Sequence, residues 1–198
     1  WLLGIAISIY IFESHGFIST LLKDDISYIS SIIIIILVYN SLSCGYYLYK
    51  LRDAILIIES NTSSNLTNNF VDACNEYKEL MSKKLDHKSV QDDFKIKLYE
   101  YVDNGFFMSD ILLKLGIVGT VIGFIIMLSS LSTIDEMNLS KMNNLLLSMS
   151  AGMKVALYTT LTGLVGSVLL SIQYNYFENK VNILINKVIN HNYHAKKE

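Results

Sequence analysis

The residues best suited to chemistry in this sequence are two threonines in apolar surroundings, Thr120 and Thr160. A hydroxyl both donates and accepts hydrogen bonds, so a threonine can contact a passing cation or a water molecule. Each threonine lies among small residues at helical spacing, i, i+3 or i+4, and i+7. The first stripe is Gly116, Gly119, Thr120 and Gly123, and the second is Ala156, Thr160, Gly163 and Ser167, which Ser171 extends.

Two apolar segments, residues 111–131 and 151–177, must hold these stripes. About 21 helical residues at 1.5 Å rise cover the roughly 30 Å of a bilayer's hydrocarbon core. Neither segment contains an acidic residue, and their only charges, Lys114 and Lys154, lie near an end. Both segments are therefore expected to be membrane-spanning helices.

The two stripes have two interpretations. Small residues let helices approach closely in a membrane, where packing drives association, so a tight helical hairpin is the first. The second is a polar path lined by the threonine hydroxyls. The residues alone favour packing, because a threonine can bond the carbonyls of its own helix.

The two stretches LGIVGTVIGF and AGMKVALYTTLTGLVGSVLLSIQYNYF together resemble the paired signature of the MotA/TolQ/ExbB family of ion-driven membrane motors. The first follows the family's LGxxGTxxG pattern. The second follows ALxxTxxGL, with Tyr174 and Asn175 trailing it. The resemblance covers about a third of the chain, and its specificity comes from the two patterns occurring in order on adjacent spans.

The resemblance implies a homo-oligomeric ring, a pentamer, enclosing two copies of a single-helix partner like MotB, TolR or ExbD that carries a membrane aspartate. Thr120 and Thr160 match the family's pore-facing threonines, so they are the expected ion-path residues. The residues expected to permit close helix packing are Gly116, Gly119, Gly123, Ala156, Gly163 and Ser167. One departure is Lys154-Val155, where ExbB and TolQ more usually have Ala-Glu and a ZorA-like defence motor has a lysine.

A proton-conducting protein needs a membrane group that binds and releases protons, normally a carboxylate. The two apolar segments hold none, so a partner chain would have to supply it. No enzymatic constellation, cofactor motif or metal-ligand spacing is visible. The competing classes are a non-conducting structural scaffold and, less favoured, a self-sufficient channel. Within the family, a MotA-like flagellar stator, a TolQ/ExbB-like transducer and a ZorA-like subunit all stay open.

The whole composition agrees with a membrane protein, since 52% of residues are hydrophobic, 17% are charged and none is proline. No basic patch with interleaved aromatics indicates nucleic acid. The expected fold is all-α and polytopic, with three to four transmembrane helices and long cytoplasmic helical extensions.

Four regions are expected along the chain. Residues 1–48 hold the N-terminal transmembrane helices, of which the first, 1–12, is too short to span and is expected to be incomplete. Residues 49–109 form a cytoplasmic helical region, 110–177 the pore-forming hairpin and 178–198 a cytoplasmic helical tail.

Charge placement orients these regions. Nine of the 16 lysines and arginines lie between residues 50 and 114, and four follow residue 177. The positive-inside rule then places both termini and the long polar stretch in the cytoplasm. The family resemblance implies that the membrane is a bacterial inner membrane. Residues 132–150 are expected to be an outward loop. Asp103-Asn104-Gly105 is expected to be a turn before the membrane.

Overall fold

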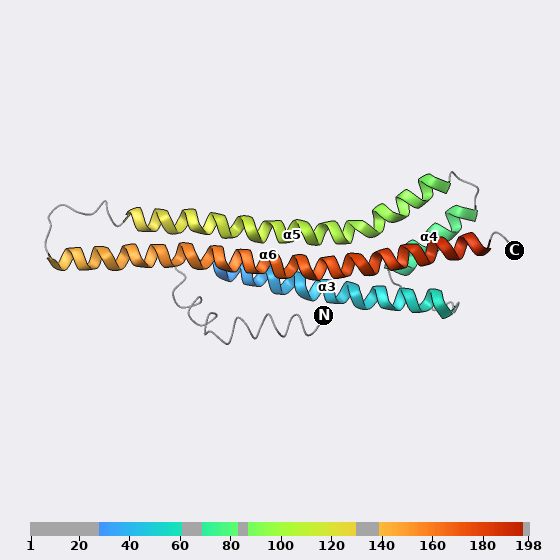
Figure 1. Ribbon diagram of the computed structural model, residues 1–198, viewed down its shortest axis with the longest axis horizontal. Coiled ribbons are helices and arrows are strands. Elements are labelled where there is room, and N and C mark those ends of the chain that lie inside the picture. Colours follow the sequence, from blue (N-terminus) through green and yellow to red (C-terminus); the bar gives the residue numbers. More distant parts are fainter. Residues whose placement is uncertain (1–27, 61–68, 83–86, 130–138, 196–198) are drawn as a thin grey trace. The chain divides into compact units, whose positions relative to one another are not determined.

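The computed structural model describes residues 28–60, 69–82, 87–129 and 139–195, and these residues form four helices with no strand. Figure 1 shows the helices as α3 to α6. Their bounds are α3 Ile29–Ser60, α4 Asn69–Ser82, α5 His87–Ser129 and α6 Leu139–Ala195. The all-α prediction is confirmed.

Three of these helices are long and apolar enough to cross a membrane. The candidate spans are Ile29–Ile57, Lys88–Ser129 and Leu145–Asn190. In lipid, a helix is the structure that satisfies every backbone group within one segment, which is why even the isoleucine-rich start of α3 is helical. The prediction of a polytopic helical membrane protein is confirmed. The additional span expected at residues 1–12 lies outside the described residues.

Two local predictions were wrong. Asp103-Asn104-Gly105 is no turn but lies inside the continuous helix α5, and α6 begins at Leu139, inside the predicted outward loop. The turn signal failed because Gly105 has another function. A Cβ at Gly105 would fall on the ring of Tyr174, so the missing side chain makes room for an aromatic residue.

The described residues divide into two compact units, and α3, α5 and α6 each contribute to both. The first unit takes residues up to 41 and residues 107–171. In its core, Ile33, Leu112 and Leu170 are fully buried. Many aliphatic side chains on its helices are exposed, as expected of surfaces that face lipid or other apolar partners.

The second unit takes residues 42–106 and 172–198, and its core is aromatic. The Phe70 ring on α4 lies 5.2 Å from that of Tyr101 and 6.3 Å from that of Phe177, measured between centroids. Tyr47 on α3 contacts the same two partners, at 5.2 Å and 6.2 Å. Side chains from all four helices thus meet in one cluster, which buries the apolar stripe of the short helix α4.

Candidate functional site

The candidate site is the contact between α5 and α6 in the first unit, where the two helices run antiparallel. Gly116 meets Gly163 backbone to backbone. A Cβ at Gly163 would lie 2.7 Å from the Gly116 Cα and 2.8 Å from the Leu112 carbonyl oxygen. Real Cβ atoms essentially never approach so closely. The helices therefore touch at a distance that only glycine permits.

The same close approach extends along the helices toward the end of α5. A Cβ at Gly119 would fall on the side chain of Thr159, and one at Gly123 would lie 2.6 Å from the Ala156 backbone nitrogen. Gly152, which the two stripes do not include, lies similarly close to Met127. We call this line of contacts, from Gly116–Gly163 to Met127–Gly152, the glycine seam. Its residues are at i, i+3 or i+4 and i+7 because one face of each helix lies in the contact.

Thr160 connects the two helices at the seam. Its Oγ1 lies 3.2 Å from the Gly116 carbonyl oxygen on α5 and 3.2 Å from the Ala156 carbonyl oxygen on its own helix. The side chain is half-buried. One hydroxyl proton serves two carbonyl acceptors here, and the oxygen lone pairs of Thr160 stay available to accept a further hydrogen bond.

Thr120 lies one turn beyond Gly116 on α5. Its Oγ1 donates to the Ile117 carbonyl at 2.5 Å within its own helix, and its side chain is also half-buried. Because Gly119 touches Thr159 and the helices are antiparallel, Thr120 and Thr160 lie at the same level of the seam. A Cβ at Gly166 of α6 would meet Ile33 and Leu37 of α3, and helix periodicity places Thr120 and Thr160 on the opposite flank of the seam.

The neighbouring threonines differ in their surroundings. Thr159 and Thr162 are buried, and their hydroxyls donate to carbonyls of the preceding turn on α6, at 2.9 Å to Val155 and 2.8 Å to Tyr158. These bonds satisfy each hydroxyl inside its own helix.

A cluster of three serines was not foreseen as a unit. The Oγ of Ser109 on α5 is 2.8 Å from the Ser167 carbonyl oxygen, 3.1 Å from the Ser167 Oγ and 2.7 Å from the Ser171 Oγ. Ser167 and Ser171 belong to the stripe seen in the sequence, but Ser109 precedes the apolar segment, and no spacing rule links it to them. The cluster joins the two helices by hydrogen bonds about two to three turns from Thr160, estimated from 3.6 residues per turn.

Charge is sparse around the seam. No carboxylate lies in residues 111–129 or 139–177 of the sequence. Lys154 lies over the Tyr158 ring, 5.7 Å from its centroid. Among the described residues, no group of three histidine, cysteine or carboxylate side chains could hold a metal ion. The seam by itself therefore offers hydroxyl and carbonyl oxygens, but no group that titrates as a membrane carboxylate does.

Antiparallel spanning helices in glycine-tight contact, with hydroxyls on one flank and no carboxylate, define a packed helical membrane protein with polar groups at a helix seam. Residues 108–189 match the family model of the MotA/TolQ/ExbB proton channel family, which confirms the resemblance and assigns this segment to that family. The match covers the glycine seam, the serine cluster and the remainder of α6 up to residue 189. No curated protein and no solved structure matches the chain significantly.

Residues 108–189 are thus similar to the proton channel family, and three helices of the chain are long and apolar enough to cross a membrane. At the glycine seam, the polar atoms that this chain offers are the hydroxyls of Thr120 and Thr160 and the neighbouring carbonyl oxygens.

Proposed function

We propose that this chain is the ring subunit of an ion-driven motor or energy-transducing complex of a bacterial inner membrane. The observation that carries the proposal is the placement of Thr120 and Thr160, which lie at one level on one flank of a seam that the family match covers. In the proposal, these two hydroxyls form the polar wall of the ion path.

The carboxylate that takes up and releases the ion comes from a partner helix. This follows from the absence of an acidic residue in the two helices that form the seam, within residues 111–129 and 139–177. By resemblance, the partner is a single-helix protein like MotB, TolR or ExbD, present in two copies inside a pentamer of this chain. Thr120 and Thr160 then contact the ion or its water beside the partner's aspartate.

The proposed topology keeps four regions. Residues 1–48 are N-terminal membrane helices, 110–177 are the pore-forming hairpin, and 49–109 and 178–198 are cytoplasmic. The charge asymmetry of the sequence supports this orientation. The continuity of α6 to Ala195 supports a helical tail.

The first test is native mass spectrometry of the complex purified under mild extraction from its own membrane. A ring that carries copies of a small single-helix protein with a membrane aspartate is the expected result. A bare oligomer or a monomer would contradict the motor proposal.

The second test compares two matched variants of α6 in that complex. Thr160→Val removes a hydroxyl on the seam flank, and Thr162→Val removes one bonded only to the Tyr158 carbonyl of its own helix. We expect Thr160→Val to lower proton or sodium flux in proteoliposomes by about 10-fold or more, which corresponds to a barrier higher by about 1.4 kcal/mol. Thr162→Val should leave the flux close to that of the parent.

A non-conducting scaffold is the second candidate, and one observation favours it. Both Thr120 and Thr160 already bond backbone carbonyls, as purely structural threonines do. The scaffold predicts that Thr160→Val and Thr120→Val leave both assembly and function intact, so the flux comparison separates the two candidates.

A further inference from the structure

In the second unit, the exposed side chains of α3 and α6 follow the same order along the chain, from aliphatic residues to tyrosines to charged residues. On α3, the exposed aliphatic Leu42 is followed by the exposed tyrosines Tyr46 and Tyr49. On α6, the exposed Ile172 is followed by the exposed Tyr176. Charged residues come next on both helices, and the basic ones are Lys50 and Arg52 on α3 and Lys180 on α6, with Asp53 and Glu178 beside them.

The two transitions lie at the same level. The Cys44 thiol of α3 is 3.8 Å from the Gln173 carbonyl oxygen of α6, and the Tyr47 and Phe177 rings are 6.2 Å apart. Both contacts pair residue n of α3 with about residue n+129 or n+130 of α6, so the helices run parallel here. Residue 52 therefore lies level with residue 181, next to Lys180.

Arg52 and Lys180 lie close to the contact between the helices. Lys180 is seven residues, two turns, beyond Gln173, so it lies on the stripe of α6 that faces α3. Arg52 follows the buried Leu51 and lies, exposed, at the edge of the corresponding face of α3. Two positive charges at one level of adjacent helices repel each other, and an anion between them would remove that cost.

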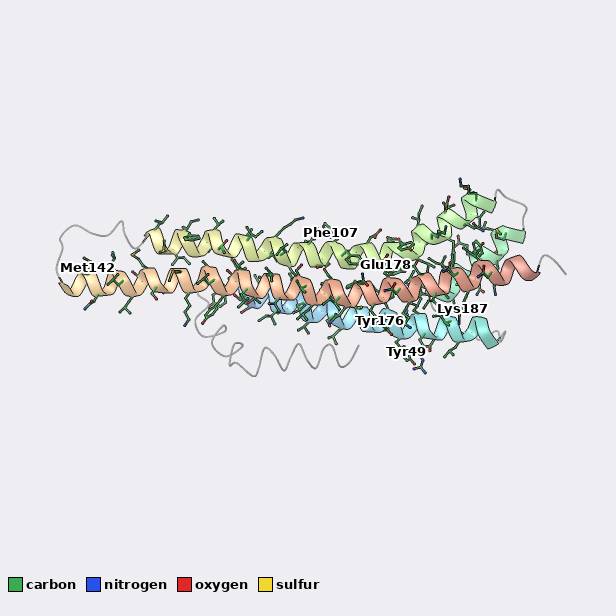
Figure 2. The ribbon with its side chains drawn as sticks, in the orientation of Figure 1. Tyr49, Phe107, Met142, Tyr176, Glu178 and Lys187 are labelled. Carbon is green, nitrogen blue, oxygen red and sulfur yellow. The ribbon has the colours of Figure 1, made fainter. Side chains whose placement is uncertain are left out.

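Exposed tyrosines lie beside the basic residues, as is typical of the boundary between a membrane and water. The Lys180 amino group lies over the Tyr176 ring, 5.3 Å from its centroid, and the Lys50 amino group lies over the Tyr46 ring at 4.8 Å. Figure 2 labels Tyr49 on α3 and Tyr176 on α6, the two exposed rings nearest this level. Tyrosine belongs at the depth of lipid headgroups, where its ring is apolar and its hydroxyl is hydrated.

We propose that Arg52 and Lys180, flanked by Tyr49 and Tyr176, bind the headgroup phosphate of an anionic phospholipid at the boundary of the membrane. The occupant is a lipid because exposed aliphatic side chains, Leu42 on α3 and Ile172 on α6, precede the basic pair by about two to three helical turns, and acyl chains can lie against them. A basic pair between membrane helices is also a common arrangement for anionic headgroups. This proposal does not depend on ion conduction.

The test measures lipid retention and thermal unfolding of the whole complex. The complex is placed in nanodiscs of phosphatidylcholine alone or mixed with phosphatidylglycerol. We expect phosphatidylglycerol to raise the unfolding temperature and to stay bound in native mass spectrometry. In the double variant Arg52→Gln and Lys180→Gln, its apparent affinity should fall by about 30-fold, from about 1 kcal/mol for each basic residue.

Two control variants make the result decisive. Lys88→Gln with Lys95→Gln removes the same charge from α5 and should retain the lipid. Arg52→Lys with Lys180→Arg keeps both charges and should retain it as well, which separates lost binding from lost folding. Equal binding by the glutamine variant, equal binding of phosphatidylcholine, or the same stabilisation by inorganic phosphate alone would each overturn the proposal.

Discussion

One added carbon atom has different effects at two glycines of α6, depending on how closely α5 approaches. Gly163 and Gly166 are three residues apart on α6, but a Cβ at Gly163 would lie 2.7 Å from the Gly116 Cα, and one at Gly166 would lie no closer than 3.7 Å to any neighbour. The first distance requires the two backbones to separate, and the second is an ordinary van der Waals contact. The two glycines are therefore a matched pair for substitution.

We expect Gly163→Ala to destabilise the protein by about 1–3 kcal/mol, as overpacking does, and Gly166→Ala to change its stability little. Thermal unfolding in one detergent, with the fraction of assembled complex measured in parallel, tests this. Equal effects of the two alanines would show that the helices separate easily at Gly163.

The thiol of Cys74 on α4 gives a pH dependence. Burial raises the pKa of this thiol from 9.0 to about 12, against a smaller opposing effect of Lys78. The folded protein thus keeps the proton while the unfolded chain releases it above about pH 9. The stability contributed by the neutral buried thiol is complete below pH 9 and is lost as the pH rises from 9 toward 12.

We therefore expect slow alkylation of Cys74 in the folded protein at pH 8 and fast alkylation after denaturation, because the thiolate is the nucleophile. Peptide mass spectrometry distinguishes Cys74 from Cys44. Cys74→Ala should weaken the fall of the unfolding temperature between pH 9 and 10. Alkylation of the folded protein at the rate of the denatured chain would contradict the burial of this thiol.

At the scale of the helices, the sequence predicted that the segments are helical and which residues share a helix face. It did not predict where a helix continues unbroken or which residues of another helix it contacts. The stripes of α5 and α6 could be recognised because helical spacing is a property of each segment alone. The packing of Gly105 inside a helix could not be foreseen, since the side chain for which it makes room, Tyr174, lies far along the chain. Ser109 was missed for the same reason, because its partners are 58 and 62 residues away.

The contact between Gly105 and Tyr174 connects α5 and α6 in the second unit. Gly105→Ala should displace the Tyr174 ring from its edge-on contact with Phe177, whose centroid is 6.2 Å away. We expect a loss of about 1–3 kcal/mol from this overpacking. In a double-mutant cycle with Tyr174→Ala, the two losses should be less than additive, because the smaller side chain frees the space. Strictly additive unfolding energies would show that the two residues do not interact.

At the scale of the whole molecule, the two units differ in what holds them together. The first is built on glycine contacts and serine hydroxyls, and the second on an aromatic cluster with a surface ion pair, Lys97 to Glu76 at 2.6 Å. The ion pair is about half exposed and therefore contributes little. The buried aromatic cluster is therefore expected to stabilise the second unit more than the ion pair does.

Phe70→Ala should consequently destabilise the second unit and leave the first unit unchanged. Removing this buried ring costs about 3–5 kcal/mol. Hydrogen exchange followed by mass spectrometry should become faster in 69–82 and 172–190 and stay unchanged in 145–171. A uniform increase over all these peptides would show that the two units unfold together.

The glycine seam also limits which mutations the protein can tolerate. Every missense change in a glycine codon adds at least one carbon atom, so Gly116, Gly119, Gly123 and Gly163 have no conservative replacement. Most positions of a membrane helix accept exchange among aliphatic residues, but these four accept no exchange without movement of the backbone or of a neighbouring side chain. Among natural variants of this protein, we therefore expect the fewest amino-acid changes at these four glycines.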